Sequence, residues 1–347
     1  EMAKELIAIA PKQAILRDYE EQPLEPHQVR IKSEASAEKH GTTLSFYRGL
    51  VPQMEKVWNP QLELFLPARE TSSLFPFPLG NITIGTVIEV GPDVTQLKAG
   101  DRVWGYLPIR ETHTVDEKRV HLIPPGLTDD EVLCIDPAVV ALMSIREGRF
   151  SLGDKVAVSG LGAIGLLATQ MAKLGGATLV VAVDPIEERR RLAEEYGADL
   201  TIDPASGDVG LAVKLATDKK GVDVSIETSG SYKALHESIR ATRYGGTIVP
   251  TSFYHGEAKG LNLGEEWHLL RQVMVSGARV ESEPYRDYPR WDRKRVYNTV
   301  IELFQKKKLS VEGFLHMVDF EDVIEAYKTL EEEPGKWIKL GVRYKKV

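Results

Sequence analysis

The sequence contains a single cysteine, Cys134, among 347 residues. An intramolecular disulfide is therefore excluded, as is a structural zinc site with four cysteine ligands, and the composition fits a reducing cytoplasm. No apolar run approaches the length of a membrane span, and the charged stretch from Glu1 to Glu5 leads into no signal-peptide core. The net charge is −7 with acidic and basic residues interleaved. We therefore expect a cytoplasmic protein with neither a membrane nor a nucleic acid as partner.

The hydrophobic fraction, 42%, and the charged fraction, 27%, are those of a globular protein, and the length leaves room for two domains. Up to about Leu142, short strands alternate with turn residues, which predicts an antiparallel β-rich domain. The strands expected there are Gln28–Ser33, Gly85–Val90, Arg102–Leu107 and Val120–Ile123.

From Ser151 to about Val280, strands alternate with helical stretches, which is typical of a doubly wound α/β domain with a six-stranded parallel sheet. Its expected strands are Val156–Ser159, Leu179–Val183, Leu200–Ile202, Val222–Glu227, Gly246–Pro250 and Met274–Val280. Helices are expected over Ile186–Tyr196, Tyr232–Thr242, Arg293–Lys308 and Glu321–Glu332, with a last strand over Trp337–Tyr344. We divide the chain into residues 1–142, 143–282 and 283–347, the last segment returning to the first domain.

A glycine motif joins the first strand of the α/β part to its first helix. Gly160, Gly162 and Gly165 form G-x-G-x-x-G, in which the first permits a tight turn, the second lets the backbone approach a pyrophosphate and the third lets the helix pack on the strand. Ala163 and Ile164 begin the helix, whose free N–H groups and positive dipole end favour phosphate. The motif predicts a dinucleotide cofactor.

Asp184 ends the second strand, 22 residues beyond Gly162, where a carboxylate accepts hydrogen bonds from the adenosine ribose. A 2′-phosphate would meet a like charge there, so we expect NAD rather than NADP. Arg189 belongs to the expected cofactor contacts. With Arg190 it is expected to face solvent rather than to grip a 2′-phosphate, although the pair is the one hint of NADP.

Several further segments together carry a family resemblance. Residues 79–91 have the sequence LGNITIGTVIEVG, which resembles G-H-E-x-x-G-x-V-x-x-V-G of the medium-chain dehydrogenase/reductase superfamily. Two further segments, 97–103 (LKAGDRV) and 136–142 (DPAVVAL), resemble segments of the zinc alcohol and polyol dehydrogenases in this superfamily. The resemblance covers nearly the whole chain. It implies a GroES-like β domain that is interrupted by a Rossmann domain.

The chain departs from this family where the catalytic zinc is held. The three ligand positions fall on His40, Asn81 and Asp136, where zinc-using members have Cys, His and a further Cys or Glu. Because an amide is a poor zinc ligand, we expect no tightly bound metal, and a weakly held one stays open.

Without zinc, a general base must take the hydroxyl proton of an alcohol. His40 lies where the family meets the reacting oxygen, and an imidazole with an ordinary pKa of roughly 6.5 suits that task. Thr42 falls on the family's hydroxyl position, which passes the proton on. His40 could instead merely fill a degenerate metal pocket. Asp136 either orients His40 or caps the helix that begins at Pro137, and Asn81 either binds a substrate hydroxyl or is a turn residue.

The remaining cofactor contacts follow from the resemblance. Ser229 follows the fourth Rossmann strand on the adenosine side, and Thr251 and Ser252 follow the fifth strand near the nicotinamide ribose. Lys339 aligns with a basic residue that reaches the pyrophosphate.

The sequence thus favours an NAD(H)-dependent oxidoreductase that interconverts a secondary alcohol, sugar-like or cyclitol-like, with its ketone. The alternatives are a zinc-free quinone or enoyl reductase and a non-catalytic NAD(H)-binding protein. An aromatic-rich insert over 50–78 would form either a substrate lid or a contact with a neighbouring subunit of a homodimer or homotetramer.

Overall fold

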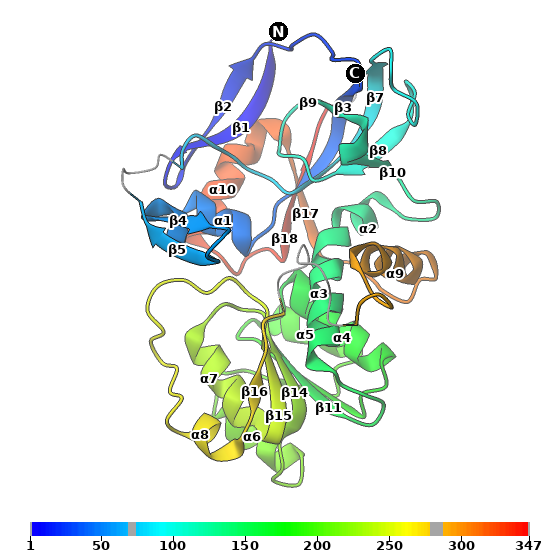
Figure 1. The fold of residues 1–347 in the computed structure, drawn as a ribbon. Coiled ribbons are helices and arrows are strands. Elements are labelled where there is room, and N and C mark those ends of the chain that lie inside the picture. Colours follow the sequence, from blue (N-terminus) through cyan, green and yellow to red (C-terminus); the bar gives the residue numbers. More distant parts are fainter. Residues whose placement is uncertain (1, 69–73, 278–286, 346–347) are drawn as a thin grey trace. The chain divides into compact units, whose positions relative to one another are not determined.

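The computed structural model describes residues 2–68, 74–277 and 287–345. The described chain forms two units (Figure 1): the first comprises residues 1–133 with 313–347, and the second comprises 134–312. The boundaries fall at 133/134 and 312/313, whereas the sequence placed them at 142/143 and 282/283. The shift arises because α3 (Ile135–Gly148) and α9 (Arg293–Gln305) pack on each other, and α3 also packs on α4 (Ala163–Leu174).

The first unit is built on a mostly antiparallel sheet, in which β9 pairs with β3 beside the path β10-β8-β7-β3-β18-β17. Its strands are β3 (Gln28–Ala37), β7 (Ile82–Val90), β8 (Arg102–Gly105), β9 (Thr112–Asp116), β10 (Val120–Leu122), β17 (Leu315–Asp319) and β18 (Lys339–Arg343). A smaller sheet contains β1 (Ala3–Ala10), β2 (Gln13–Tyr19) and β6 (Phe77–Pro78). Strand β18 runs antiparallel to β3, with Gly341 opposite Ala37. The last strand of the chain therefore lies against an early one.

Two short helices and three 3₁₀ turns complete the first unit together with α10. These are α1 (Thr42–Tyr47), α2 (Asp129–Leu133) and 3₁₀ turns over Pro52–Met54, Glu117–Arg119 and Phe320–Asp322; α10 spans Val323–Glu332. Tyr47 of α1 and Tyr327 of α10 meet edge to face in the core, with their ring centroids 5.4 Å apart. This packing fixes α1, which begins directly after His40 and Gly41.

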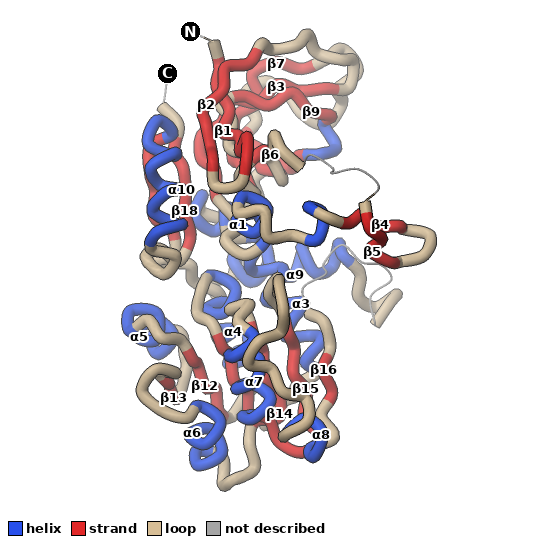
Figure 2. Tube along the Cα trace, turned by 90° about the vertical axis from the view of Figure 1, so that its left-hand side faces the viewer, coloured by secondary structure: helices blue, strands red, loops and turns tan. Residues whose placement is uncertain are grey.

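The second unit contains a six-stranded parallel sheet in the order β13-β12-β11-β14-β15-β16. Its strands are β11 (Lys155–Ser159), β12 (Leu179–Val183), β13 (Leu200–Ile202), β14 (Val222–Glu227), β15 (Thr242–Pro250) and β16 (Val273–Met274). Besides α3, α4 and α9, its helices are α5 (Glu187–Glu195), α6 (Val209–Ala216), α7 (Tyr232–Ala241) and α8 (Glu266–Leu270), as the tube in Figure 2 shows. The order is that of a doubly wound dinucleotide-binding sheet, which confirms the expected α/β fold.

The predicted elements are found within a few residues, with informative differences. Strand β3 continues to Ala37, four residues past the predicted end, because β7 and β18 pair with it on its two sides despite the weak strand preference of Glu34–Ala37. The predicted last Rossmann strand is shorter, and its residues 278–280 lie outside the described residues. No helix of the described chain has both the length and the apolarity that a membrane crossing requires.

The 50–78 insert forms a two-stranded hairpin that the sequence analysis did not predict, made of β4 (Lys56–Asn59) and β5 (Leu64–Pro67). Trp58 lies opposite Phe65, with ring centroids 5.1 Å apart, and both side chains are substantially exposed. Val57 pairs with Leu66 at the neighbouring position, so these two side chains lie on the other face of the ribbon. The hairpin therefore exposes apolar side chains on both faces.

Candidate active-site residues

The glycine motif has the geometry that its sequence predicts. Gly160 has a φ of +83°, and a Cβ there would lie 2.7 Å from the main-chain nitrogen of Ser229. A Cβ on Gly165 would lie 1.7 Å from the carbonyl oxygen of Gly160, so helix α4 could not approach the turn with any larger residue. A Cβ on Gly162 would have, among the described residues beyond its two chain neighbours, only a guanidinium nitrogen of Arg189 within 4 Å, at 4.0 Å. Two glycines thus permit close packing and the third leaves room above the turn, as a bound pyrophosphate requires.

Asp184 lies beside this turn at the end of β12. Its Oδ2 accepts a hydrogen bond from the Leu161 N–H at 2.8 Å, and its Oδ1 accepts one from the Ile186 N–H at 2.8 Å. The carboxylate therefore ties the glycine turn to the start of α5. Each carboxylate oxygen has further acceptor capacity, so these contacts are compatible with a ribose hydroxyl as an additional donor.

The expectation that Arg189 and Arg190 face solvent is wrong. Arg190 donates from Nη1 to the Asp184 carbonyl oxygen at 2.8 Å, and the Arg189 side chain is largely buried near Gly162. Burial lowers the pKa of Arg189, and the negative charge of Asp184 opposes that effect. Both side chains fold back because the carbonyl and carboxylate of Asp184 supply partners next to the turn.

Ser229, Thr251 and Ser252 lie on the two loops that follow β14 and β15. A buried acid that the sequence analysis missed, Glu227, connects these loops: its Oε1 accepts from the Ser229 N–H at 2.7 Å, and its Oε2 accepts from the Tyr254 hydroxyl. Its carbonyl oxygen also accepts from the Thr251 N–H at 2.9 Å. Burial raises the pKa of Glu227, against the effect of these hydrogen bonds. An acid that ends a buried strand directly before Thr-Ser-Gly was the available signal.

In the first unit, His40, Thr42 and Asn81 gather near the end of β3. The Asn81 N–H donates to the Ala37 carbonyl oxygen at 2.9 Å, and Thr42 is the first residue of α1. His40 accepts a hydrogen bond at Nε2 from the Leu340 N–H at 2.9 Å. In a neutral imidazole with this contact, the proton sits on Nδ1, so Nδ1 is a donor.

Asp136 belongs to the second unit, where it is the second residue of α3 and is buried. The N-cap of α3 is Cys134, so the reading of Asp136 as the cap of a helix beginning at Pro137 is wrong. The helix starts two residues earlier than the Pro signal indicated.

The residues at the family's ligand positions do not fit zinc. The Nε2 lone pair of His40 already faces the Leu340 N–H, and coordination through Nδ1 would place a protonated Nε2 against that donor. Asn81 offers only an amide. We therefore derive no chemical step through a metal.

Lys339, the expected pyrophosphate contact, is buried in the first unit. Its Nζ donates to the carbonyl oxygen of Glu38 at 2.7 Å. Glu38 is itself fully buried, and burial raises its pKa to about 7 against the opposing effects of the Lys39 N–H and the Lys339 charge. Sequence reasoning overlooked Glu38, although an acid two residues before His40 in an otherwise small-residue strand end is an unusual feature.

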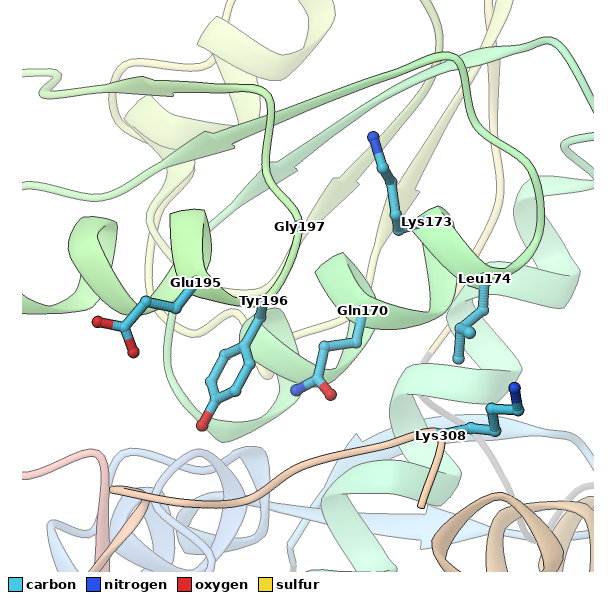
Figure 3. Close-up of a pocket in the computed structure, with 7 residues that line it drawn as sticks. All are labelled: Gln170, Lys173, Leu174, Glu195, Tyr196, Gly197 and Lys308. Atoms are coloured by element: carbon cyan, nitrogen blue, oxygen red, sulfur yellow. The ribbon is translucent and has the colours of Figure 1, made fainter. Parts of the chain in front are cut away.

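Two other groups of side chains lie away from the glycine turn. A hollow at the opposite, carboxyl-terminal end of α4 is lined by Gln170, Lys173, Leu174, Glu195, Tyr196, Gly197 and Lys308 (Figure 3). The amide of Gln170 both donates to and accepts from the main chain of Ser310, and Lys173 pairs with Asp199 at 2.8 Å. These contacts connect α4 to the chain at Ser310 and at Asp199.

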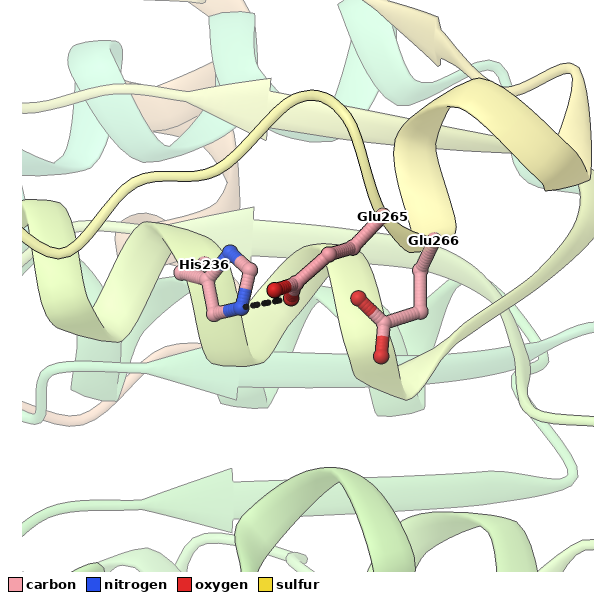
Figure 4. A group of neighbouring side chains, drawn as sticks. All are labelled: His236, Glu265 and Glu266. Carbon is pink, nitrogen blue, oxygen red and sulfur yellow. Dashed lines mark ion pairs between the residues drawn. The ribbon is translucent and has the colours of Figure 1, made fainter.

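His236, Glu265 and Glu266 have ligand atoms within 4.8 Å of one another (Figure 4). His236 accepts at Nδ1 from the Asn262 N–H, which leaves the proton on Nε2, facing Glu265 at 3.4 Å. Glu266 pairs with Arg240 at 3.3 Å. The arrangement is that of an ion-pair cluster, with the imidazole acting as donor.

The chain has a β-rich unit that is interrupted by a doubly wound unit, and in the second unit Asp184 lies beside the glycine turn. This arrangement is that of a dinucleotide-dependent dehydrogenase or reductase. Residues 25–122 match the alcohol dehydrogenase GroES-like domain, and residues 163–294 match the zinc-binding dehydrogenase family. The chain belongs to the medium-chain dehydrogenase/reductase superfamily, as its sequence motifs indicated, and it is an oxidoreductase of the alcohol dehydrogenase type.

Individual relatives agree with this assignment. D-guloside 3-dehydrogenase of Escherichia coli K12 is 38% identical over 350 residues, covering 98% of this chain and all of the relative. The (R,R)-butanediol dehydrogenase of Bacillus subtilis is 30% identical over 246 residues, covering 62% of this chain and 70% of the relative. The crystal structure of 2R,3R-butanediol dehydrogenase from the same species superposes with a TM-score of 0.75 at 26% identity, over 98% of this chain and 99% of that one.

Proposed function

We propose that the chain oxidises a ring hydroxyl of a glycoside or a related cyclic polyol to a ketone with NAD, and catalyses the reverse reduction with NADH. The observation that carries this proposal is the 38% identity to D-guloside 3-dehydrogenase along the whole chain. The polar residues His40, Thr42 and Asn81 at the end of β3 suit a substrate with several hydroxyl groups. When bound, NAD accepts the hydride from the carbinol carbon, and the hydroxyl proton leaves separately.

For the proton, we propose that Thr42 contacts the reacting oxygen and that His40 acts beside it. The neutral His40 ring, held at Nε2 by Leu340, presents Nδ1–H, which can donate a hydrogen bond to the reacting oxygen while the hydroxyl proton passes through Thr42 to solvent water. To accept the proton itself, His40 would first have to release Leu340. Both versions require the neutral ring, so oxidation should rise with pH through the range in which an imidazole titrates.

For the cofactor, we propose NAD rather than NADP, held by the glycine turn, Asp184 and Arg189, together with Ser229, Thr251 and Ser252 on the loops that follow β14 and β15.

A screen of glycosides, sugars and polyols that follows the absorbance of reduced nicotinamide tests the function. Turnover of quinones or enoyl compounds instead would favour the reductase alternative. NAD binding without turnover of any of these substrates would favour a non-catalytic protein.

We propose that turnover needs no zinc, since Asn81 replaces a ligand and His40 is engaged by Leu340. We expect the purified enzyme to contain far less than one zinc per chain and to keep its activity after treatment with a chelator. Elemental analysis of the sample used for the kinetic assay measures this. Stoichiometric zinc together with chelator-sensitive turnover would overturn the zinc-free mechanism.

We further propose a homo-oligomer whose contact covers the β4–β5 hairpin. An isolated two-stranded ribbon is marginally stable in water, and this one exposes 48% of Trp58 and 40% of Phe65. Replacing both aromatics by serine should lower the oligomeric state measured by light scattering after size-exclusion chromatography. The control replaces Leu211 and Leu215, exposed on α6, by serine. A parent protein that is already monomeric at tens of micromolar would contradict this prediction.

A further inference from the structure

Two residues of opposite charge lie in the interior of the first unit, next to the residues proposed to handle the proton. Glu38 is fully buried and Lys339 is 3% exposed. Burying charged groups is costly unless they are paired and hydrogen-bonded. The Lys339 Nζ donates to the Glu38 carbonyl oxygen at 2.7 Å, and the Glu38 carboxylate accepts from the Lys39 N–H at 2.6 Å. The fold thus retains two ionisable side chains at a place where apolar residues would ordinarily be found.

Several contacts of these residues concern one stretch of chain, residues 38–43, which we name the 38–43 segment. Outside it, the Gly80 N–H also favours the charged form of the Glu38 carboxyl group, and the Lys339 N–H donates to the Phe314 carbonyl oxygen at 3.1 Å. Lys339 and Leu340, the first two residues of β18, form hydrogen bonds with the first residues of this segment. Besides the Lys339 bond, the Glu38 N–H donates to the Leu340 carbonyl oxygen at 3.0 Å, and the Leu340 N–H donates to His40 Nε2 at 2.9 Å. At the other end of the segment, the Thr43 N–H donates to the Lys39 carbonyl oxygen at 3.2 Å.

Side chains within the 38–43 segment also interact with one another. Thr43, which stands one residue after Thr42, is buried, and its hydroxyl favours the charged form of the Glu38 carboxyl group. The Glu38 carboxylate therefore accepts from the residue before His40 and lies near the hydroxyl of the residue after Thr42, while its Oε2 has no hydrogen-bond partner among the described residues. A loop that must present an imidazole and a hydroxyl in fixed positions gains from such internal contacts, because catalysis is sensitive to displacements of about 1 Å.

We propose that Lys339 and Glu38 are positioning residues: their buried side chains hold the 38–43 segment in the conformation that presents His40 and Thr42, in place of the metal ligation that this segment does not fit. The proposal rests on the proposed function for its kinetic consequences. It departs from the expectation that Lys339 contacts the pyrophosphate, since its ammonium lies inside the first unit against a main-chain carbonyl group.

The two roles for Lys339 give different results in the full-length protein. We expect Lys339→Met and Glu38→Gln each to lower kcat at saturating NAD by about tenfold, and to leave the Kd of NAD within about threefold of the parent. The double variant should be little worse than either single variant, because both changes disable the same contact network. Lys339→Arg, which keeps the charge, should recover part of the loss. A Kd for NAD raised tenfold with kcat retained would instead assign Lys339 to the pyrophosphate and overturn the proposal.

A second measurement does not need a substrate. Hydrogen–deuterium exchange of the peptides that cover residues 38–43 should become faster in Lys339→Met and in Glu38→Gln. The matched control is Lys214→Met, because the Lys214 Nζ also donates to main-chain carbonyl oxygens, those of Lys220 and Thr242 at 3.0 Å, but in the second unit. It should leave exchange in 38–43 unchanged. If exchange there stays at the parent rate in both test variants, the positioning role is wrong whatever the substrate is. If exchange quickens while every sugar and polyol fails as substrate, only the proposed function is lost.

Discussion

A His40→Asn enzyme is expected to fold, to bind NAD with unchanged affinity and to turn over about 10²–10⁴-fold more slowly, the range for losing a group that handles the proton. Asparagine removes the imidazole chemistry and keeps a polar side chain, although its amide is too short to reach the Leu340 N–H from which Nε2 accepts. Stopped-flow or steady-state rates at saturating NAD, together with a titration of NAD binding, measure the two effects separately.

The pH profile adds a second signature to this variant. In the parent, oxidation should rise with pH as the ring becomes neutral, and that step should be absent in His40→Asn. Thr42→Val should cost less if solvent replaces the hydroxyl, and nearly as much if Thr42 is the only route for the proton. A His40→Asn enzyme whose turnover is within about threefold of the parent would remove this histidine from the mechanism. The role would then pass to Asp136 or Lys39.

Replacing Asp184 by serine should abolish a preference for NAD over NADP that we expect to be about tenfold or greater, because the carboxylate repels a 2′-phosphate. The ratio of kcat/KM for the two cofactors measures the effect. Asp184 also accepts hydrogen bonds from the Leu161 and Ile186 N–H groups, so the variant loosens the glycine turn as well.

Asp184→Asn removes the charge and keeps the side-chain shape, but its amide NH2 meets one of the two N–H groups from which Asp184 accepts. If charge sets the selectivity, both variants should lose the preference, and both should lose thermal stability. An unchanged NAD/NADP ratio in both variants would mean that the carboxylate does not meet the ribose.

The part of the site that sequence predicts is the part formed by neighbours in the chain. Gly160, Gly162 and Gly165 stand within six residues, and each has a conformational or packing reason that the structure repeats. Asp184 follows a short strand whose place beside β11 is dictated by the α/β rhythm. Local spacing was sufficient for these residues.

The parts that escaped prediction depend on contacts between distant residues. The hydrogen bond of Lys339 with Glu38 spans 301 positions and that of Leu340 with His40 spans 300 positions, and no local pattern records either. Likewise Glu227 gains its role only when Tyr254, from the loop after the next strand, reaches it. The inward orientation of Arg190 also required the Asp184 carbonyl oxygen as a partner that composition cannot reveal.

The pairing of β18 with β3 has a consequence for synthesis on the ribosome. Lys339 and Leu340 are made after the whole second unit, yet they hold His40 and Glu38, which are made before it. The second unit lies between them in the chain and can fold while the first waits with an unpaired edge on β3. The second unit can therefore fold before β18 is available to hold the 38–43 segment. A polypeptide that stopped before Lys339 would retain the glycine turn and lack the strand that pairs with the end of β3.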